Sequence, residues 1–169
     1  MNPFKALDDM RTIKQLLTES ERIARDLGER EPGAEHLLLS AMALPDGSGA
    51  RAMATVGADA DAVRSALVAE QADALVSAGM PRERAEALAV PEPLDDGDRP
   101  RIYAAGPTAR EVFRAAGDRA RASKQRLAGA HVVAAIADVE HGTVARVLDR
   151  LGVDRQRLSE AARAELTAS

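Results

Sequence analysis

The stretch HLLLSAMALPDGSGARAMATVGAD at residues 36–59 returns, with substitutions, as HVVAAIADVEHGTVARVLDRLGVD at residues 131–154. The copies align without a gap, because each matching pair is separated by 95 residues. The identical pairs are His36 and His131, Gly47 and Gly142, Ala50 and Ala145, Arg51 and Arg146, Gly57 and Gly152, and Asp59 and Asp154. The chain has only three histidines, so two at equivalent positions indicate a duplicated unit.

Apolar residues inside and around the copies recur at steps of three and four residues, which is the period of an amphipathic helix. This pattern predicts helices over residues 5–27, 34–44, 49–56, 59–75 and 82–89, a further helix that begins at Thr108, and helices over residues 129–139, 143–151 and 154–166. No segment shows the two-residue alternation of a half-buried strand. We therefore predict an all-α fold.

The duplication divides the chain into three parts. Residues 1–89 form the first repeat plus an extra helix, residues 90–107 form a connector, and residues 108–169 form the second repeat. The connector contains four prolines and the acidic stretch PEPLDDGDRP. It is too short and too charged to bury a core of its own.

Composition excludes several classes of protein. Hydrophobic residues make up 46% of the chain, which is enough for a core, but the net charge of −4 argues against nucleic-acid binding, which normally needs a basic excess. The absence of cysteine excludes disulfides and thiolate metal sites. No apolar run approaches the ~20 residues of a membrane span, and MNPFKALDDM lacks the basic and apolar regions of a signal peptide. We expect a cytoplasmic protein with neither a membrane nor a nucleic acid as partner.

Each copy carries short motifs in the same order. The first has GAEHLL at residues 33–38 and VGAD at 56–59, and the second has AREV at 109–112, GAHVV at 129–133 and LGVD at 151–154. These motifs resemble the Clp N-terminal repeat, which occurs in pairs at the front of the Clp/Hsp100 unfoldases, and the resemblance covers essentially the whole chain. It implies two pseudo-twofold four-helix repeats packed as one compact bundle, with a groove between them. Because the sequence has no GxxxxGK[ST] phosphate loop, we expect a stand-alone form without the ATPase modules of an unfoldase.

The resemblance also implies ligand-binding residues. In the family, the groove and the N-terminal arm accept adaptors, substrate peptides and cyclic-peptide antibiotics, and aromatic side chains are common anchors in such grooves. The expected ligand-binding residues are Phe4, Lys5, Leu7, Glu35 and Phe113. In relatives that accept phosphoarginine, the Glu of the family motif binds the guanidinium group, and the resemblance carries that role to Glu35 alone. The alternative for Phe113 is a place in the core, which the first helices of the two repeats would form by packing their apolar faces together.

A second group of residues is expected to hold the framework. His36 and His131 each begin a helix, where we expect the imidazole to hydrogen-bond the preceding loop; a metal or catalytic pair is the alternative. Gly57, Gly152, Asp59 and Asp154 would form the turns and caps before the fourth helix of each repeat. For Arg51 and Arg146 the alternatives are solvation and the binding of an acid or phosphate.

These observations favour a binding module without enzymatic activity, because only unspecific carboxylates such as Glu35, Asp46 and Asp138 could support catalysis. We expect it to bind peptides, adaptors or cyclic-peptide small molecules, and thereby to sequester antibiotics or to modulate Clp proteolysis. The alternatives are a structural partner that docks on Clp ATPase or protease subunits, and a binder of phosphoarginine substrates through Glu35. No catalytic residue, metal or cofactor is expected.

Overall fold

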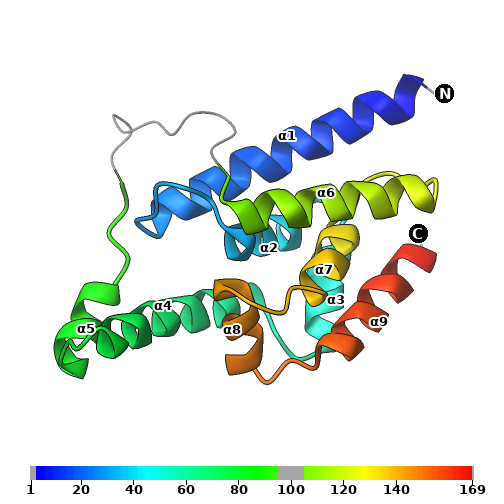
Figure 1. The fold of residues 1–169 in the computed structure, drawn as a ribbon. Coiled ribbons are helices and arrows are strands. Elements are labelled where there is room, and N and C mark those ends of the chain that lie inside the picture. The colour runs from blue at the N-terminus through cyan, green and yellow to red at the C-terminus, as the bar shows by residue number, and fades with distance from the viewer. Residues whose placement is uncertain (1–2, 95–104, 169) are drawn as a thin grey trace.

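The computed structural model describes residues 3–94 and 105–168, with side chains from residue 9 onward. These residues form helices and no strand, which confirms the all-α prediction (Figure 1). The helices are α1 (Pro3–Asp26), α2 (Ala34–Met42), α3 (Ser48–Thr55), α4 (Ala60–Ser77), α5 (Arg82–Ala89), α6 (Pro107–Ala122), α7 (Gly129–Ala137), α8 (Thr143–Arg150) and α9 (Arg155–Thr167). None of these helices is both long enough and apolar enough to pass through a bilayer.

Four helices make up each repeat, α1–α4 in the first and α6–α9 in the second, and α5 follows the first repeat. The sequence places α5 at the residues where the structure has it. The helix α6 begins at Pro107, one residue earlier than predicted, because proline already has a helical φ and its missing N–H is not needed in the first turn. Residues 95–104 of the connector lie outside the described residues.

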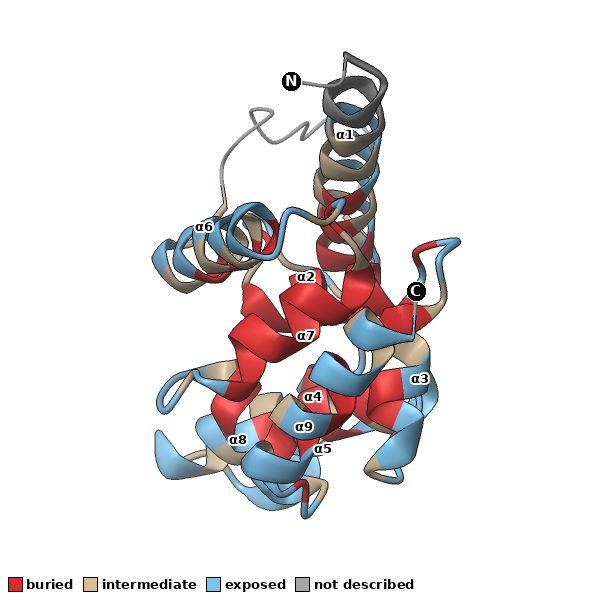
Figure 2. Cartoon of the chain, turned by 90° about the vertical axis from the view of Figure 1, so that its right-hand side faces the viewer, coloured by how far each residue is buried: buried red, intermediate tan, exposed pale blue. Residues whose placement is uncertain are grey.

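The centre of the molecule is the pair α2 and α7, in which every residue is buried (Figure 2). Glycines allow the backbones to approach closely here. A Cβ atom on Gly129, the first residue of α7, would lie 2.6 Å from the carbonyl oxygen of Ala41 and 2.9 Å from the backbone nitrogen of Gly49. A Cβ atom on Gly49 would lie 2.5 Å from the same Ala41 oxygen. Any larger residue would push α7 away from the first repeat.

The two repeats exchange contacts reciprocally, because the helix α3 packs on α9 and α8 packs on α4. Arg51 on α3 pairs with Glu165 on α9 at 2.7 Å, and Arg146 on α8 pairs with Glu70 on α4 at 3.0 Å. The two arginines are equivalent residues of the repeats, and so are the two glutamates. A contact that each half makes to the other in the same way is the geometry of a twofold axis, here a pseudo-twofold axis within one chain.

The fourth helix of each repeat begins in the same way. Asp59 and Asp154 are the N-cap residues of α4 and α9, and each side chain accepts a hydrogen bond from the backbone N–H three residues on, at 2.8 and 3.1 Å. Gly57 and Gly152, two residues before these caps, have φ of 79° and 66°. A side chain is strained at such angles, so both turns favour glycine.

Candidate functional site

An apolar groove lies between the first helices of the two repeats. The helices α1 and α6 cross the central pair side by side, and each packs on the second helix of its own repeat (Figure 1). The prediction that α1 and α6 pack their apolar faces together is wrong, because a cavity of about 340 Å³ separates them. The fully buried residues of α1 and α6, such as Leu16 and Val112, face the central helices. Leu17 and Phe113 lie at the edges of the two apolar faces and are half-buried.

The lining of this groove is almost entirely apolar. It consists of Ile13, Leu17 and Ser20 of α1, Pro32, Gly33 and Leu37 at the start of the second helix, and Ala105, Ala109, Arg110 and Phe113 at the start of α6. The hydroxyl of Ser20 donates to the carbonyl oxygen of Leu17 at 2.9 Å, so it is already used within α1. The described lining therefore offers an incoming ligand hydrophobic contact and, at Arg110, one charged group.

The two walls of the groove are equivalent parts of the repeats. Leu16 and Val112 are both buried and lie 96 residues apart, as do Ala24 and Ala120. The separation exceeds that of the later helices by one, because seven residues join α1 to α2 and six join α6 to α7. In the same register Leu17 corresponds to Phe113, so the groove is built from matching positions on its two sides.

The predicted ligand-binding residues fall in different places. Phe113 lies on the wall of the groove. Phe4, Lys5 and Leu7 belong to the first turns of α1, and their side chains lie outside the described residues. Glu35 does not line the groove. Of the two predicted residues whose side chains the structure describes, Phe113 lies at this surface and Glu35 does not.

Glu35 lines a second and smaller cavity of about 200 Å³. The other walls of this cavity come from the second repeat, including Gly106 and Thr108 at the start of α6 and Thr143 at the start of α8. Gly33 and Ala109 line both this cavity and the groove, so the two hollows are adjacent. A ligand in the groove could therefore extend toward Glu35.

The carboxyl group of Glu35 is held in a nearly dry site. The residue is 7% exposed, and burial raises its pKa, while a hydrogen bond from its own backbone N–H acts in the opposite direction. The side chain folds back over Gly33, where a Cβ atom would lie 1.9 Å from Oε1 of Glu35. The equivalent position in the second repeat is Ala130, so this acid has no counterpart.

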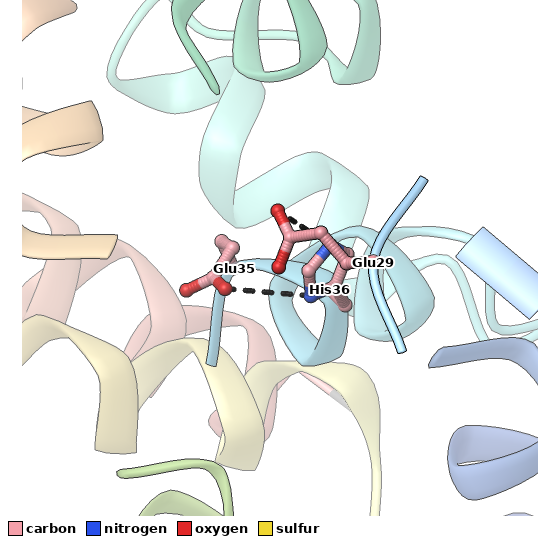
Figure 3. Close-up of side chains that lie close together, drawn as sticks. All are labelled: Glu29, Glu35 and His36. Atoms are coloured by element: carbon pink, nitrogen blue, oxygen red, sulfur yellow. Dashed lines mark ion pairs between the residues drawn. The ribbon is translucent and has the colours of Figure 1, made fainter. Parts of the chain in front are cut away.

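Glu29, Glu35 and His36 form the one group of three histidine or acidic side chains among the described residues whose oxygen and nitrogen atoms lie within 4.8 Å of one another (Figure 3). Nδ1 of His36 accepts a hydrogen bond from the backbone N–H of Gly33 at 2.9 Å, and Oε1 of Glu35 lies 3.4 Å from the same nitrogen. Oε1 of Glu29 lies 3.8 Å from Nε2 and also accepts a hydrogen bond from Gln71 at 2.8 Å. Burial lowers the pKa of His36 to about 4 and raises the pKa of Glu29.

This cluster does not have the chemistry of a metal site. A neutral imidazole that accepts a hydrogen bond at Nδ1 carries its proton on Nε2, and Nε2 then has no lone pair for an ion. The two carboxylates also approach different ring nitrogens. His131 is arranged in the same way as His36, with Nδ1 accepting from the N–H of Ala128 at 3.2 Å, although it belongs to no such group of acids among the residues that the structure describes. Each histidine thus accepts a hydrogen bond from the backbone N–H of the N-cap residue of its own buried helix, a group that has no partner within the helix.

The sequence analysis left open whether Arg51 and Arg146 are solvated or bind an acid, and the structure pairs each with a glutamate of the other repeat. The two glutamates were missed, although Glu70 and Glu165 also lie 95 residues apart. The groove residue Leu17 could have been found from its match with Phe113. That match was hidden because the register of the first helices differs by one residue from that of the later helices.

Comparison with known proteins supports the same architecture. Residues 11–86 match the family model described as the Clp repeat (R) N-terminal domain. No curated protein matches the chain. Among solved structures, the chain is similar to the N-terminal domain of the caseinolytic protease associated chaperone ClpD from Arabidopsis thaliana, with a TM-score of 0.55 and 22% sequence identity over 95% of this chain and 92% of that chain. The family model covers the first repeat, and the similarity of fold extends over both.

Proposed function

Since residues 11–86 carry the repeat of the Clp N-terminal domain family, we propose that this protein is a non-enzymatic module that binds peptide segments of adaptors or substrates. Its binding site is the groove between α1 and α6. The observation that carries the proposal is the unfilled apolar cavity of about 340 Å³ at the boundary of the repeats. A cavity of this size and lining is typical of a site that accepts a few hydrophobic side chains.

The groove is suited to capture rather than to catalysis. Its walls contain no nucleophile paired with a base, since the hydroxyl of Ser20 is bonded to its own helix and Arg110 cannot accept a proton at neutral pH. Among the described residues that line the groove, Phe113 alone is aromatic, and a half-buried aromatic residue can contact a ligand with little loss of side-chain entropy. We expect Phe113 to be the main hydrophobic contact.

A peptide library tests this proposal. Random dodecapeptides displayed on phage are selected on the whole protein, and the affinity of enriched peptides is then measured by fluorescence polarisation. Phe113→Ala and Leu17→Ala should each weaken binding about tenfold, which corresponds to the loss of one buried hydrophobic contact. Leu75→Ala on α4 is the matched control and should leave the affinity unchanged. If no peptide is enriched, or if all three variants bind as the parent does, the groove is not the binding site.

The partner of this module is a finer part of the same proposal. A protein that shares the groove of an unfoldase could sequester cyclic-peptide antibiotics, or could compete for adaptors and so modulate Clp proteolysis. A shift in melting temperature with a cyclic peptide, lost in Phe113→Ala, supports the first role. Recovery of Clp subunits in a pull-down that Phe113→Ala does not affect would instead favour structural docking.

The cavity beside Glu35 supports a second candidate ligand, a phosphoarginine side chain. A planar guanidinium group pairs well with a carboxylate, and the first N–H groups of α6 lie at the same cavity, where an anion is stabilised. Thermal shift with free phosphoarginine, compared with arginine and with inorganic phosphate, is the test. The response should exceed both controls and disappear in Glu35→Gln; equal responses to all three compounds would refute this second role.

A further inference from the structure

One rim of the groove is strongly basic, and we propose that the groove is selective for acidic peptides, in which a hydrophobic residue is followed or preceded by carboxylates. This inference rests on the proposed peptide-binding function and adds the chemical class of the ligand. The basic rim is formed by Arg110, Arg114 and Arg121, all of them exposed on α6. We call these three residues the basic rim.

Helical geometry puts Arg114 and Arg121 on the same face of α6 as Arg110, the arginine that lines the groove. Arg114 follows Arg110 by four residues and Arg121 follows it by eleven, so the three side chains lie within about 40° of one another around the helix axis. Arg110 itself lines the groove, next to Ala109 and one turn before Phe113. Gly117 lies between Arg114 and Arg121 on the same face, and the guanidinium group of Arg121 lies 3.9 Å from the place of a Cβ atom there. The rim is therefore a row of three arginines on the exposed face of α6.

Two of the three arginines of this rim are available to a ligand. Arg110 and Arg114 form no ion pair with any acidic side chain among the described residues, whereas Arg119, on the other side of α6, is paired with Asp138. Arg121 is paired with Asp118 on its own helix. Two arginines near the mouth of the groove are thus without internal compensation, although the chain as a whole has a net charge of −4. This local excess of positive charge is a property of the groove and not of the whole surface.

The other charged groups near the groove do not cancel the basic rim. On α1, the exposed Lys14 adds a positive charge one turn before Leu17, and Glu21 one turn after Leu17 offsets it. Glu111 faces a different hollow, on the opposite flank of α6. Glu35 is buried in the neighbouring cavity and is not exposed at the mouth of the groove. The balance at the mouth of the groove is positive.

The dimensions fit an extended peptide. With a rise of 1.5 Å per residue, Arg110 and Arg121 lie roughly 16 Å apart along α6, which is about the length of five residues of extended chain. A ligand that buries one apolar side chain against Phe113 could therefore place carboxylates beside Arg110 and Arg114 at the same time. Guanidinium groups bind carboxylates bidentately, so each contact adds selectivity as well as affinity.

The library selection described above tests this inference with two further variants. Arg110→Glu/Arg114→Glu reverses the charge of the rim without changing the lining at Phe113 or Leu17. Arg157→Glu/Arg163→Glu makes the same change of charge at two exposed positions on α9 and is the matched control. Enriched peptides are synthesised with their Asp and Glu residues intact, and also with those residues replaced by Asn and Gln. Circular dichroism confirms that each variant is folded before binding is measured.

We expect the parent protein and the α9 control to select peptides rich in Asp and Glu, and the rim variant to lose this bias. Each exposed ion pair is worth a factor of roughly two to five in affinity, so the neutral peptides should bind the parent about tenfold more weakly than the acidic ones, and less so at high salt. If peptides are enriched and depend on Phe113 but show no acidic bias, the inference fails and the proposed function stands. If no peptide is enriched by the parent protein, both fail.

Discussion

The close approach of α7 to the first repeat makes Gly129 the position where one methyl group should cost most. In Gly129→Ala the added Cβ atom would lie 2.6 Å from the carbonyl oxygen of Ala41 and 2.9 Å from the nitrogen of Gly49. Both contacts are with backbone, so no side chain can rotate away. The helix α7 must shift by several tenths of an ångström, and it is buried along its whole length.

Overpacking of this kind costs about 1–3 kcal/mol. For a chain of this size, each kcal/mol lowers the melting temperature by about 2–4 °C, so Gly129→Ala should melt roughly 3–10 °C below the parent. Gly117→Ala is the matched control. It makes the same chemical change inside α6, where the nearest atom to the new Cβ is 3.9 Å away, and it should stabilise the protein by about 0.5–1 kcal/mol because alanine favours a helix more than glycine does.

Urea unfolding followed by circular dichroism measures both free energies. The two substitutions should change the free energy of unfolding in opposite directions. If Gly129→Ala proves as stable as the parent, or more stable, then α7 does not approach Ala41 and Gly49 in the way described, and the packing of the two repeats would have to be reconsidered.

Three further predictions concern the charged and buried groups of the framework. Glu70 on α4 forms ion pairs with both Arg146 and Arg150, so Glu70→Gln should lower the free energy of unfolding by about 1 kcal/mol. Glu111→Gln, on the exposed surface of α6, should change this free energy by less than half as much, and equal effects of the two substitutions would mean that the ion pairs between the repeats contribute nothing. Burial lowers the pKa of His36 to about 4, so the unfolded chain binds a proton at this histidine before the folded chain does as the pH falls. The free energy of unfolding should therefore drop between about pH 6.5 and pH 4, by up to about 3 kcal/mol. The difference in this free energy between the parent and His36→Gln should shrink over the same window, and a constant difference would refute the assigned environment. The pKa of Glu35 is raised by burial, so the ionised carboxylate destabilises the folded state above the pKa that this group has in the unfolded chain. In urea unfolding, the stability gained by Glu35→Gln over the parent should therefore be larger at pH 8 than at pH 5. A larger gain at pH 5 would contradict this prediction.

The sequence predicts the helices well because the duplication supplies two independent views of each helix. Its matched positions also identify the caps Asp59 and Asp154 and the left-handed glycines before them, since those features depend on local backbone geometry. The boundaries differ from the predicted ones by one or two residues at most ends. Pro107, for example, is the first residue of α6 and not the last residue of the connector.

The groove could not be predicted in the same way, because it depends on how tightly two helices pack. The apolar stripes of α1 and α6 resemble the faces of two helices that touch. In the structure, the most apolar residues of each stripe are directed at the central pair α2 and α7, and the edges of the stripes are left to line a cavity. Whether such edges meet or remain apart depends on distances of a few ångströms between the helices, and the spacing of apolar residues in the sequence does not determine these distances.

The charge pattern at the groove was likewise invisible to composition. A net charge of −4 gives no sign of a basic rim. The rim emerges only when α6 is oriented by its buried residues, because then Arg110 lines the groove and Arg114 follows it one turn later, whereas Glu111 lines a hollow on the other flank. The orientation of one helix thus separates charges that are neighbours in the sequence.

The most direct test of the central claim is to locate a bound peptide on the protein. Nitrogen–proton NMR spectra recorded during titration with a library-selected peptide report which backbone amides change environment. The largest chemical-shift changes should occur in the described parts of α1 and α6 that line the groove, around Leu17, Ala109 and Phe113. The chemical shifts of the α9 amides should not change. Shifts centred on α9 or on α5, with the groove amides unchanged, would show that the peptide binds elsewhere and would contradict the account.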